Sequence, residues 1–208
     1  MDKNAIPKAT LGRLPKYLQY LKNLSEDSPD TISAAALARG LSLGEVQVRK
    51  DLASVSGGGR PKVGYIKSEL IQDIEDRLGC NSLTPAVLVG AGKLGRALLD
   101  YNGFEEYGVR IVAAFDCNDK LVRKEGGDSK DILPVSEIYD FCRDNSIRLG
   151  IITVGEGSAQ SVCDMLVKSG IDAIWNFAPC RLVVPEGVLL KQENLALSLA
   201  YLNNQLHQ

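Results

Sequence analysis

The chain has 208 residues, of which 45% are hydrophobic and 24% are charged, and its formal net charge is −2. This balance fits one or two small globular domains and excludes disordered, collagen-like and coiled-coil proteins. No uncharged apolar stretch approaches the roughly 20 residues of a membrane-spanning helix. The first residues resemble neither an export nor a transit signal, so we expect a cytoplasmic protein.

Histidine and cysteine are poorly placed for metal or nucleophilic chemistry. The single histidine, His207, is next to last, which argues against most hydrolase and metalloenzyme sites. The five cysteines form no CxxC pair, so we expect buried, inert thiols in a reducing compartment. The sequence predicts no catalytic residue and no metal site.

Positive charge is concentrated near the N-terminus. Residues 1–78 hold 12 Lys and Arg against 10 Asp and Glu, whereas residues 79–208 hold 12 against 16. Within 46–67, five basic residues accompany one acidic residue. Such a cluster is what a phosphate-contacting surface requires.

Two helices are predicted first. Residues 11–24 carry apolar side chains at helical spacing, which indicates an amphipathic helix. A short second helix, capped by Thr31 or Ser33, should stop at Gly40.

A third helix follows a turn of about four residues, with Ser42 as its expected N-cap. Its inward side is predicted to carry Val46, Leu52 and Val55. Its outward side is predicted to carry Gln47, Arg49 and Lys50. Taken alone, these outward residues also fit a solvated helix face.

Residues 56–66 form a glycine-rich loop between two short extended runs, the pattern of a β-hairpin. Three helices and a hairpin predict a winged helix-turn-helix domain, whose third helix enters the major groove while the wing lies on the backbone or minor groove. The candidate DNA contacts are Gln47, Arg49, Lys50, Arg60, Lys62 and Tyr65. A linking helix is expected over 68–78, ended by Gly79.

From residue 85 onward strands and helices alternate, which predicts a parallel, doubly wound α/β sheet of the Rossmann type. We expect strands at 86–90, 109–116, 149–155, 172–177 and 182–190, and helices at 93–102, 135–145 and 158–169. The carboxyl ends of parallel strands share one edge, where a ligand binds at the point at which the strand order reverses.

A glycine-rich loop joins the first of these strands to its helix. Its residues are Gly90, Ala91, Gly92, Lys93, Leu94 and Gly95. In a GxGxxG loop the three glycines allow a tight turn, close approach of a pyrophosphate, and packing of the helix on the sheet. The alternative is a tight turn that binds nothing.

Asp116 ends the second strand, 21 residues after Gly95. This is the place of the carboxylate that accepts the ribose hydroxyls of NAD and repels a 2′-phosphate. The sequence therefore favours NADH and NAD+ over their phosphorylated counterparts.

Four segments together resemble the Rex family of redox-sensing transcriptional repressors, over almost the whole chain. They are IPKATLGRLPKY at 6–17, QVRKDL at 47–52, VGAGKLGR at 89–96 with DYNGF at 100–104, and NFAP at 176–179. The resemblance implies a homodimer that represses fermentative and NADH-reoxidising genes and leaves a palindromic operator when NADH rises. It also implies three parts: a winged-helix domain over 1–79, a Rossmann domain over 80–190, and a C-terminal helix over 191–208 that swaps onto the partner subunit.

The last helix supports that expectation on its own. Over 192–206 it places Leu195, Leu199, Leu202 and Leu206 on one stripe. This stripe fits packing against a partner subunit, and a helix packed on its own domain is the alternative.

The residues expected near the nicotinamide lie at strand ends and after the glycine-loop helix. They are Tyr101, Phe104, Thr153, Val154, Phe177 and Pro179, together with the partner's Leu195.

Three features depart from the pattern of the family. The wing reads VSGGGRPKVGY at 55–65, which makes a different operator preference an expectation. Gln19 and Asn194 stand where many members carry arginine and aspartate, and we expect the weaker pair to reduce coupling to NADH. Leu195 replaces an aromatic side chain.

Three rival functions remain open. A dehydrogenase would need a substrate domain and a proton donor, yet only about 20 residues follow the predicted Rossmann core. A CoA-binding module shares the fold, but Asp116 argues for a free ribose diol. A DNA-binding protein that has lost its ligand is the third.

Overall fold

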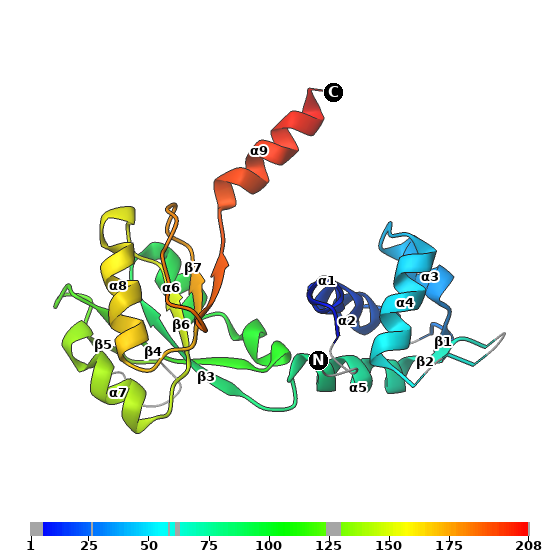
Figure 1. Ribbon diagram of the computed structural model, residues 1–208, viewed down its shortest axis with the longest axis horizontal. Coiled ribbons are helices and arrows are strands. Elements are labelled where there is room, and N and C mark those ends of the chain that lie inside the picture. The colour runs from blue at the N-terminus through cyan, green and yellow to red at the C-terminus, as the bar shows by residue number, and fades with distance from the viewer. Residues whose placement is uncertain (1–5, 26, 58, 61–62, 124–129, 208) are drawn as a thin grey trace. The chain divides into compact units, whose positions relative to one another are not determined.

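The computed structural model describes residues 6–25, 27–57, 59–60, 63–123 and 130–207. They form two compact units (Figure 1). One consists of Met1–Ser82 with Glu106–Gly108, and the other of Leu83–Glu105 with Val109–Gln208.

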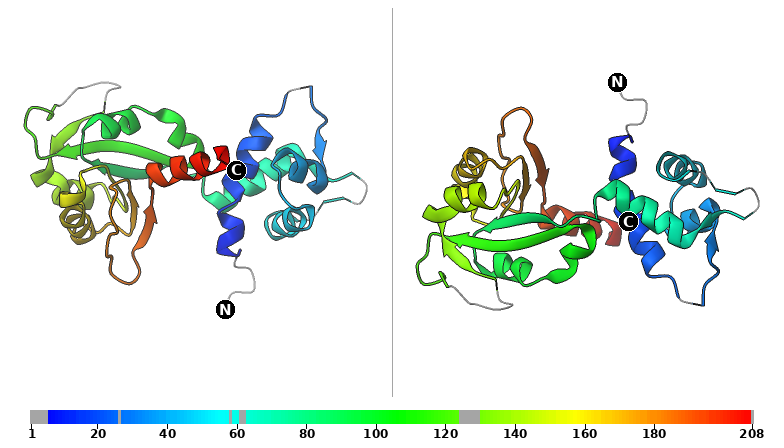
Figure 2. Two further views of the ribbon diagram at one scale, coloured as in Figure 1. Left: turned by 90° about the horizontal axis from the view of Figure 1, so that it is seen from above. Right: turned by 90° about the horizontal axis from the view of Figure 1, so that it is seen from below.

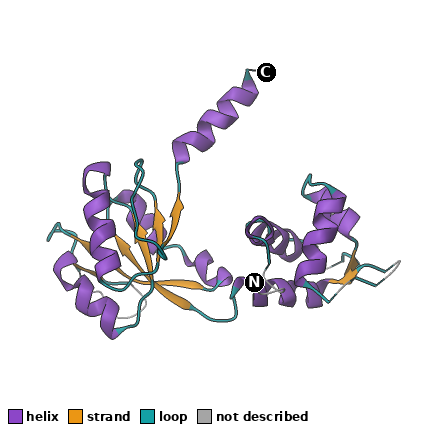
Figure 3. Ribbon diagram, in the orientation of Figure 1, coloured by secondary structure: helices purple, strands orange, loops and turns teal. Residues whose placement is uncertain are grey.

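The N-terminal unit is mainly helical and contains a small two-stranded sheet (Figure 3). Its elements are α1 (Lys8–Leu11), α2 (Leu14–Lys22), β1 (Thr31–Ile32), α3 (Ala34–Gly40), α4 (Glu45–Val55), β2 (Tyr65–Ile66) and α5 (Lys67–Leu78). Apolar stripes on α2, α3, α4 and α5 meet in one core, which includes Leu18, Leu37, Val48, Leu52, Leu70 and Ile74. Ser33 caps α3 by accepting a hydrogen bond from the Ala36 amide, which confirms one of the two predicted caps.

The third helix differs from its prediction in start and phase. Ser42 is not its N-cap, because α4 begins at Glu45 after Gly44 and Ser42 has a φ of 54°. Val46, expected inside, is 67% exposed, and Val48 lies in the core instead.

The expected hairpin is confirmed only in part. β2 pairs antiparallel with β1, which lies more than 30 residues earlier in the chain, and not with the segment just before the loop. The loop itself is closed by a bridge between Arg60 and Gly64. Lys62, a predicted wing contact, lies outside the described residues.

The second unit holds a six-stranded sheet in the order β5-β4-β3-β6-β7-β8, and every neighbouring pair is parallel. Relative to the first strand of the sheet this order is 3-2-1-4-5-6, that of a Rossmann fold, which confirms the predicted fold class. The strands are β3 (Thr84–Val89), β4 (Val109–Asp116), β5 (Ile132–Pro134), β6 (Leu149–Ile152), β7 (Ala173–Asn176) and β8 (Leu189–Gln192).

Helices cover both faces of this sheet (Figure 2). They are α6 (Lys93–Leu99), α7 (Ile138–Asp144) and α8 (Glu156–Lys168), with short 3₁₀ helices η1 (Asn102–Tyr107) and η2 (Val135–Glu137). Val87 and Val89 of β3 face the core under α7 and α8, while Ala86 and Leu88 face the core under α6. Three details differ from the prediction. The strand β5 was not predicted, and α6 ends at Leu99 instead of at residue 102. The strand expected over 182–190 is the shorter β8, Leu189–Gln192.

The last helix, α9 (Leu195–Leu206), follows β8 directly. Asn194 caps it by accepting hydrogen bonds from the amides of Ala196 and Leu197. Every α9 side chain that the structure describes is exposed. No helix among the described residues is long and apolar enough to cross a membrane.

Candidate functional site

The glycine loop has the geometry that its sequence predicts. Gly90 has a φ of +103°, which side-chain-bearing residues rarely adopt. A Cβ on Gly95 would lie 1.9 Å from the Gly90 carbonyl oxygen, so α6 approaches the loop as closely as it does only because residue 95 is glycine. A Cβ on Gly92 would meet no atom within 4 Å, so the backbone is open there to a ligand.

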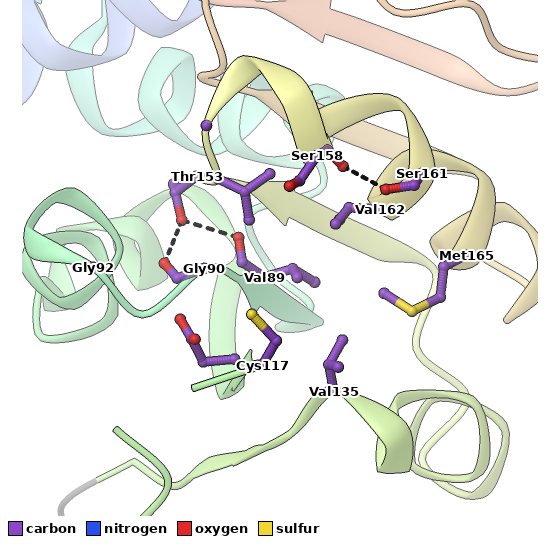
Figure 4. A pocket seen from close by; sticks show the side chains of 13 residues that line it. Val89, Gly90, Gly92, Cys117, Val135, Thr153, Ser158, Ser161, Val162 and Met165 are labelled. Atoms are coloured by element: carbon purple, nitrogen blue, oxygen red, sulfur yellow. Dashed lines mark hydrogen bonds between the residues drawn. The ribbon is translucent and has the colours of Figure 1, made fainter. Parts of the chain in front are cut away.

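Thr153 fastens this turn from the neighbouring strand end. Its hydroxyl lies 2.7 Å from the Gly90 carbonyl oxygen and 3.1 Å from that of Val89 (Figure 4). Thr153 follows β6 directly. It lies beside the glycine loop because β3 and β6 are parallel neighbours, so the residues after both strands lie at the same edge of the sheet. Thr153, which the sequence predicts to lie near the nicotinamide, therefore positions the glycine loop.

Asp116 lies beside the loop at the end of β4. Its Oδ2 accepts a hydrogen bond from the Ala91 amide at 2.7 Å, and its Oδ1 accepts one from the Asn118 amide at 2.8 Å. A carboxylate has about four acceptor positions, so these two bonds leave room for two ribose hydroxyls. The carboxylate stands where the ribose of a dinucleotide is held in this fold.

A cavity of about 610 Å³ opens between the loop, the end of β4 and the start of α8 (Figure 4). Its lining residues are Val89, Gly90, Gly92, Asp116, Cys117, Val135, Thr153, Val154, Gly155, Ser158, Ser161, Val162 and Met165. Asp116 and Thr153 lie beside the glycine loop, Val135, Val162 and Met165 contribute apolar side chains, and Ser158 and Ser161 of α8 lie beside Val162. This arrangement suits an adenosine: an apolar base against the apolar side chains and a ribose at the carboxylate.

The remaining predicted cofactor residues belong to a different part of the sheet. Tyr101, Phe104 and Phe177 do not line this cavity. Together with Trp175 they form a row of rings, with centroid separations of 5.0 Å from Tyr101 to Phe104, 5.7 Å from Phe104 to Trp175 and 4.5 Å from Trp175 to Phe177. Three of these rings pack against the core under α6, on the opposite face from the cavity. The predicted cofactor residues therefore divide into an adenosine group and an aromatic group.

The other members of the loop lie at the start of α6. Lys93 and Leu94 are exposed, whereas Ala91 is buried and contributes its amide. Pro179 follows Ala178, whose backbone is bound by the side chain of the fully buried Asn176.

Cysteine burial agrees only in part with expectation. Burial raises the pKa of Cys142 to about 11 and also raises that of Cys163, so these thiols stay protonated. Cys117, in contrast, is exposed at the cavity. No group of residues in the part of the chain that is described is suited to hold a metal ion.

The predicted DNA contacts are mostly on the surface. Gln47, Arg49 and Lys50 are exposed on α4, and Arg49 forms an ion pair with Glu45 one turn earlier. Arg60 is exposed in the wing. Tyr65 is 9% exposed and packs in the core of the unit, so its inclusion as a DNA contact is corrected.

Sequence reasoning missed a buried polar cluster beneath α4. Asp51 is 4% exposed, and its carboxylate accepts from the Arg13 Nε at 2.7 Å and Nη2 at 2.8 Å. It also accepts from the Tyr17 hydroxyl at 2.6 Å and the Thr10 hydroxyl at 2.9 Å. The signal was available: Asp51 falls three residues after Val48 and four before Val55, on the inward stripe.

The electrostatics of this cluster are set by competition between burial and hydrogen bonding. Burial opposes ionisation of Asp51, but the bonds from Arg13, Tyr17 and Thr10 outweigh it and lower the pKa of the carboxyl. Burial, followed by the bond to Asp51, raises the pKa of Tyr17 to about 12. Asp51 is therefore charged and Tyr17 neutral at pH 7.

Two family models match the chain. One, described as a CoA binding domain, covers residues 81–180, and the other, described as a putative DNA-binding protein N-terminus, covers residues 5–53.

Full-length relatives carry one name. A redox-sensing transcriptional repressor Rex of Clostridium botulinum (strain Alaska E43 / Type E3) is 40% identical over 209 residues, spanning 100% of this chain and 99% of the relative. A Rex of Carboxydothermus hydrogenoformans is 40% identical over 197 residues, spanning 95% of this chain and 94% of the relative.

Solved structures of one Rex-family repressor, RSP, resemble the whole chain. RSP in complex with β-NAD+ and operator DNA has a TM-score of 0.89 at 33% identity, covering 97% of this chain and 93% of RSP. RSP in complex with β-NADH has a TM-score of 0.87 at 32% identity, covering 97% and 94%.

Proposed function

The chain belongs to the Rex family of redox-sensing transcriptional repressors, and we propose that it binds operator DNA and leaves it when NADH occupies the glycine-loop site. One observation carries the proposal. An exposed helix with basic residues and a preformed dinucleotide loop occur in one chain that matches its relatives from end to end. This function would be carried out in the cytoplasm, where the operator DNA is.

The DNA half rests on α4. Its surface offers Gln47, Arg49 and Lys50 to a major groove, and Arg60 of the wing adds a positive charge. RSP, which shares the fold, has been crystallised on operator DNA. We assign base contacts to α4 and phosphate contacts to the wing.

The dinucleotide half rests on the loop and on Asp116. The open backbone at Gly92 and the amides that begin α6 would hold the pyrophosphate, and Asp116 would hold the adenosine ribose. The Asp116 carboxylate would repel the negatively charged 2′-phosphate of NADPH, which supports NADH as the ligand. When bound, the cofactor supplies a ring whose charge differs between its reduced and oxidised forms.

The aromatic row is the proposed neighbour of the nicotinamide. Tyr101, Phe104 and Phe177 offer apolar ring surfaces near the carboxyl end of β7. Such surfaces favour the neutral dihydronicotinamide over the cationic ring of NAD+, because removing a cation from water is costly.

The proposed assembly is a homodimer that exchanges α9. Leucines on this helix are exposed, with exposed fractions of 61% at Leu195, 67% at Leu197, 67% at Leu199, 57% at Leu202 and 82% at Leu206. Clustered exposed apolar side chains of this kind mark an interaction surface, and we assign this one to a second copy of the chain. We propose that the chain consists of a DNA-binding domain at 1–79, a Rossmann domain at 80–190 and a swapped helix at 191–208.

Release from DNA follows from linkage. NADH can weaken DNA binding only if it prefers the arrangement of the dimer that does not fit the operator. Operator DNA must then weaken NADH by the same factor, for which about 5- to 150-fold is typical. Because Gln19 and Asn194 are amides, we expect a value near the lower end.

The rival functions have weaker support. The CoA-binding description of residues 81–180 fits the shared fold, but the names of the full-length relatives and the NADH complex of RSP favour NADH. The same relatives are named repressors, which argues against a dehydrogenase.

The test is NADH affinity with and without saturating operator DNA, measured by calorimetry on the full-length protein. We expect weaker NADH binding on DNA, and a gel shift in which NADH, but not NAD+, releases the operator. Equal NADH affinities in the two titrations would refute redox sensing while leaving DNA binding intact.

A further inference from the structure

The outward face of α4 presents a large apolar side chain to solvent. Val46, the second residue of the helix, is 67% exposed. Val48 is fully buried in the core, and because a helix turns by about 200° over two residues, Val46 lies on the side opposite the core. In the part of the chain that the structure describes, Val46 belongs to none of the apolar clusters. Packing within the fold therefore gives no reason for a valine at this position.

Helix formation gives no reason either. Valine is stiff at χ1 and has a lower helix propensity than alanine, lysine or glutamine, so it costs an exposed first turn some stability. Nor is Val46 part of an apolar patch. Among the described residues of the N-terminal unit, the only other large apolar side chain that is exposed is Val63, in the wing.

The surface around Val46 is polar and carries a net positive charge. Arg49 and Lys50 lie three and four residues later, which makes them its neighbours on the helix surface. Glu45 pairs with Arg49, so the charge of Lys50 remains. Val46, Gln47 and Lys50 line one groove of about 620 Å³ beside α4. A single valine in such surroundings suits a polyanion that carries a small apolar group better than it suits an apolar protein surface.

Double-stranded DNA carries such a group. The C5 methyl group of thymine lies in the major groove, and apolar side chains contact it. In helix-turn-helix proteins the N-terminal residues of the recognition helix contact the base edges. Val46 stands in the first turn of α4, one turn before Lys50, and therefore occupies the part of the helix that reaches the bases.

Resting on the proposed function, we propose that Val46 is a specificity-determining residue that contacts the methyl group of a thymine in the operator. The contact removes two apolar surfaces from water, whereas cytosine has no methyl group to offer. Gln47, Arg49 and Lys50 act through hydrogen bonds and charge. Those interactions do not distinguish thymine from uracil, which differ only in this methyl group. Val46 thus supplies a thymine preference that its polar neighbours cannot.

The experiment uses an operator duplex that the full-length wild-type protein selects from random-sequence DNA. Each thymine is replaced in turn by deoxyuridine, which removes the methyl group and leaves every hydrogen-bonding group in place. Binding is measured by fluorescence anisotropy of the labelled duplex. At one thymine of each half-site we expect the wild type to lose affinity by about 3- to 5-fold, the equivalent of one buried methyl group.

Val46→Ala is the decisive variant. It shortens an exposed side chain and raises helix propensity, so its thermal stability should equal or exceed that of the wild type. Its affinity for the thymine operator should fall. Deoxyuridine at the sensitive position should then change its binding by less than about 1.5-fold, because the partner of the methyl group is gone.

Two further variants serve as controls. Val183→Ala shortens a valine that is 74% exposed in the second unit, and it should keep the wild-type response to deoxyuridine. Lys50→Ala removes a charge beside Val46 and should weaken the thymine and deoxyuridine duplexes by the same factor. Weakened DNA binding alone therefore does not abolish the response to the methyl group.

Three results would overturn the proposal. They are a selected operator in which no thymine is sensitive to deoxyuridine, a Val46→Ala variant that keeps the methyl sensitivity, and a Val46→Ala variant that binds every duplex as the wild type does. Wild-type protein that selects no sequence would refute the proposed function and this proposal with it. That outcome is distinguished at the selection step, before any base is replaced.

Discussion

Replacing glycine by alanine at two positions of one loop should separate ligand binding from folding. At Gly92 the added methyl group meets no atom of the protein within 4 Å, and the φ of −67° is open to alanine. At Gly95 the same methyl group would lie 1.9 Å from the Gly90 carbonyl oxygen and 2.9 Å from the Thr153 hydroxyl. One site has room within the protein and the other has none.

The magnitudes follow from these contacts. Overpacking costs about 1–3 kcal/mol, and since 1 kcal/mol corresponds to about 2–4 °C for a chain of this size, Gly95→Ala should lower Tm by about 2–12 °C. Gly92→Ala should leave stability unchanged or raise it by up to about 1 kcal/mol. It should nevertheless weaken NADH about 10- to 150-fold, the equivalent of losing one charge-assisted hydrogen bond to the pyrophosphate.

The assay pairs thermal unfolding by circular dichroism with NADH calorimetry on the same preparations. Gly57→Ala, at an equally open position in the N-terminal unit, is the control and should alter neither quantity. Wild-type NADH affinity in Gly92→Ala, or wild-type stability in Gly95→Ala, would refute the reasoning from the loop.

Three further predictions concern single side chains. Asp116→Ala should weaken NADH by about 1.5–3 kcal/mol in calorimetry, and wild-type protein that binds NADPH as well as NADH would contradict this role. The folded state lowers the pKa of Asp51 below its ordinary 3.8, so ionised Asp51 stabilises the fold fully above pH 3.8, and this stabilisation is lost as the pH falls further. Urea unfolding of the wild type should therefore show a lower free energy of unfolding at pH 3 than at pH 5. An equal decrease in Asp51→Asn would exclude Asp51 as the cause. Leu199→Glu should shift the protein toward monomer in analytical ultracentrifugation, and an unchanged dimer would mean that α9 is not the interface.

The sheet could be predicted from the sequence because its signals are local. The apolar run of β3 is buried on both faces, and Gly90, Gly92 and Gly95 follow it within a few residues. At Gly95 the atom that requires glycine, the Gly90 carbonyl oxygen, belongs to the same short segment, so the local pattern and the structure agree there.

The N-terminal unit was predicted less well, because its determinants are distant in sequence. Asp51 is an acidic residue on an inward stripe, and that position is favourable because Thr10, Arg13 and Tyr17, which lie far earlier in the chain, donate hydrogen bonds to it. Without knowledge of these partners, the apolar pattern favours Val46 as an inward residue, whereas Val46 is 67% exposed. The partner of β2 likewise comes from β1, across two intervening helices, and short-range turn signals contain no information about such pairing.

The aromatic row has an optical consequence. Trp175 is the single tryptophan of the chain, so all indole emission arises from one ring, which lies between Phe104 and Phe177. Its Nε1 donates to Glu193 at 3.3 Å, two residues before α9 begins. Indole emission is sensitive to its polar surroundings, and NADH absorbs in the same spectral range. Unlabelled protein therefore has a built-in fluorophore close in structure to the residues that precede α9, and dinucleotide binding can be followed by its emission in real time.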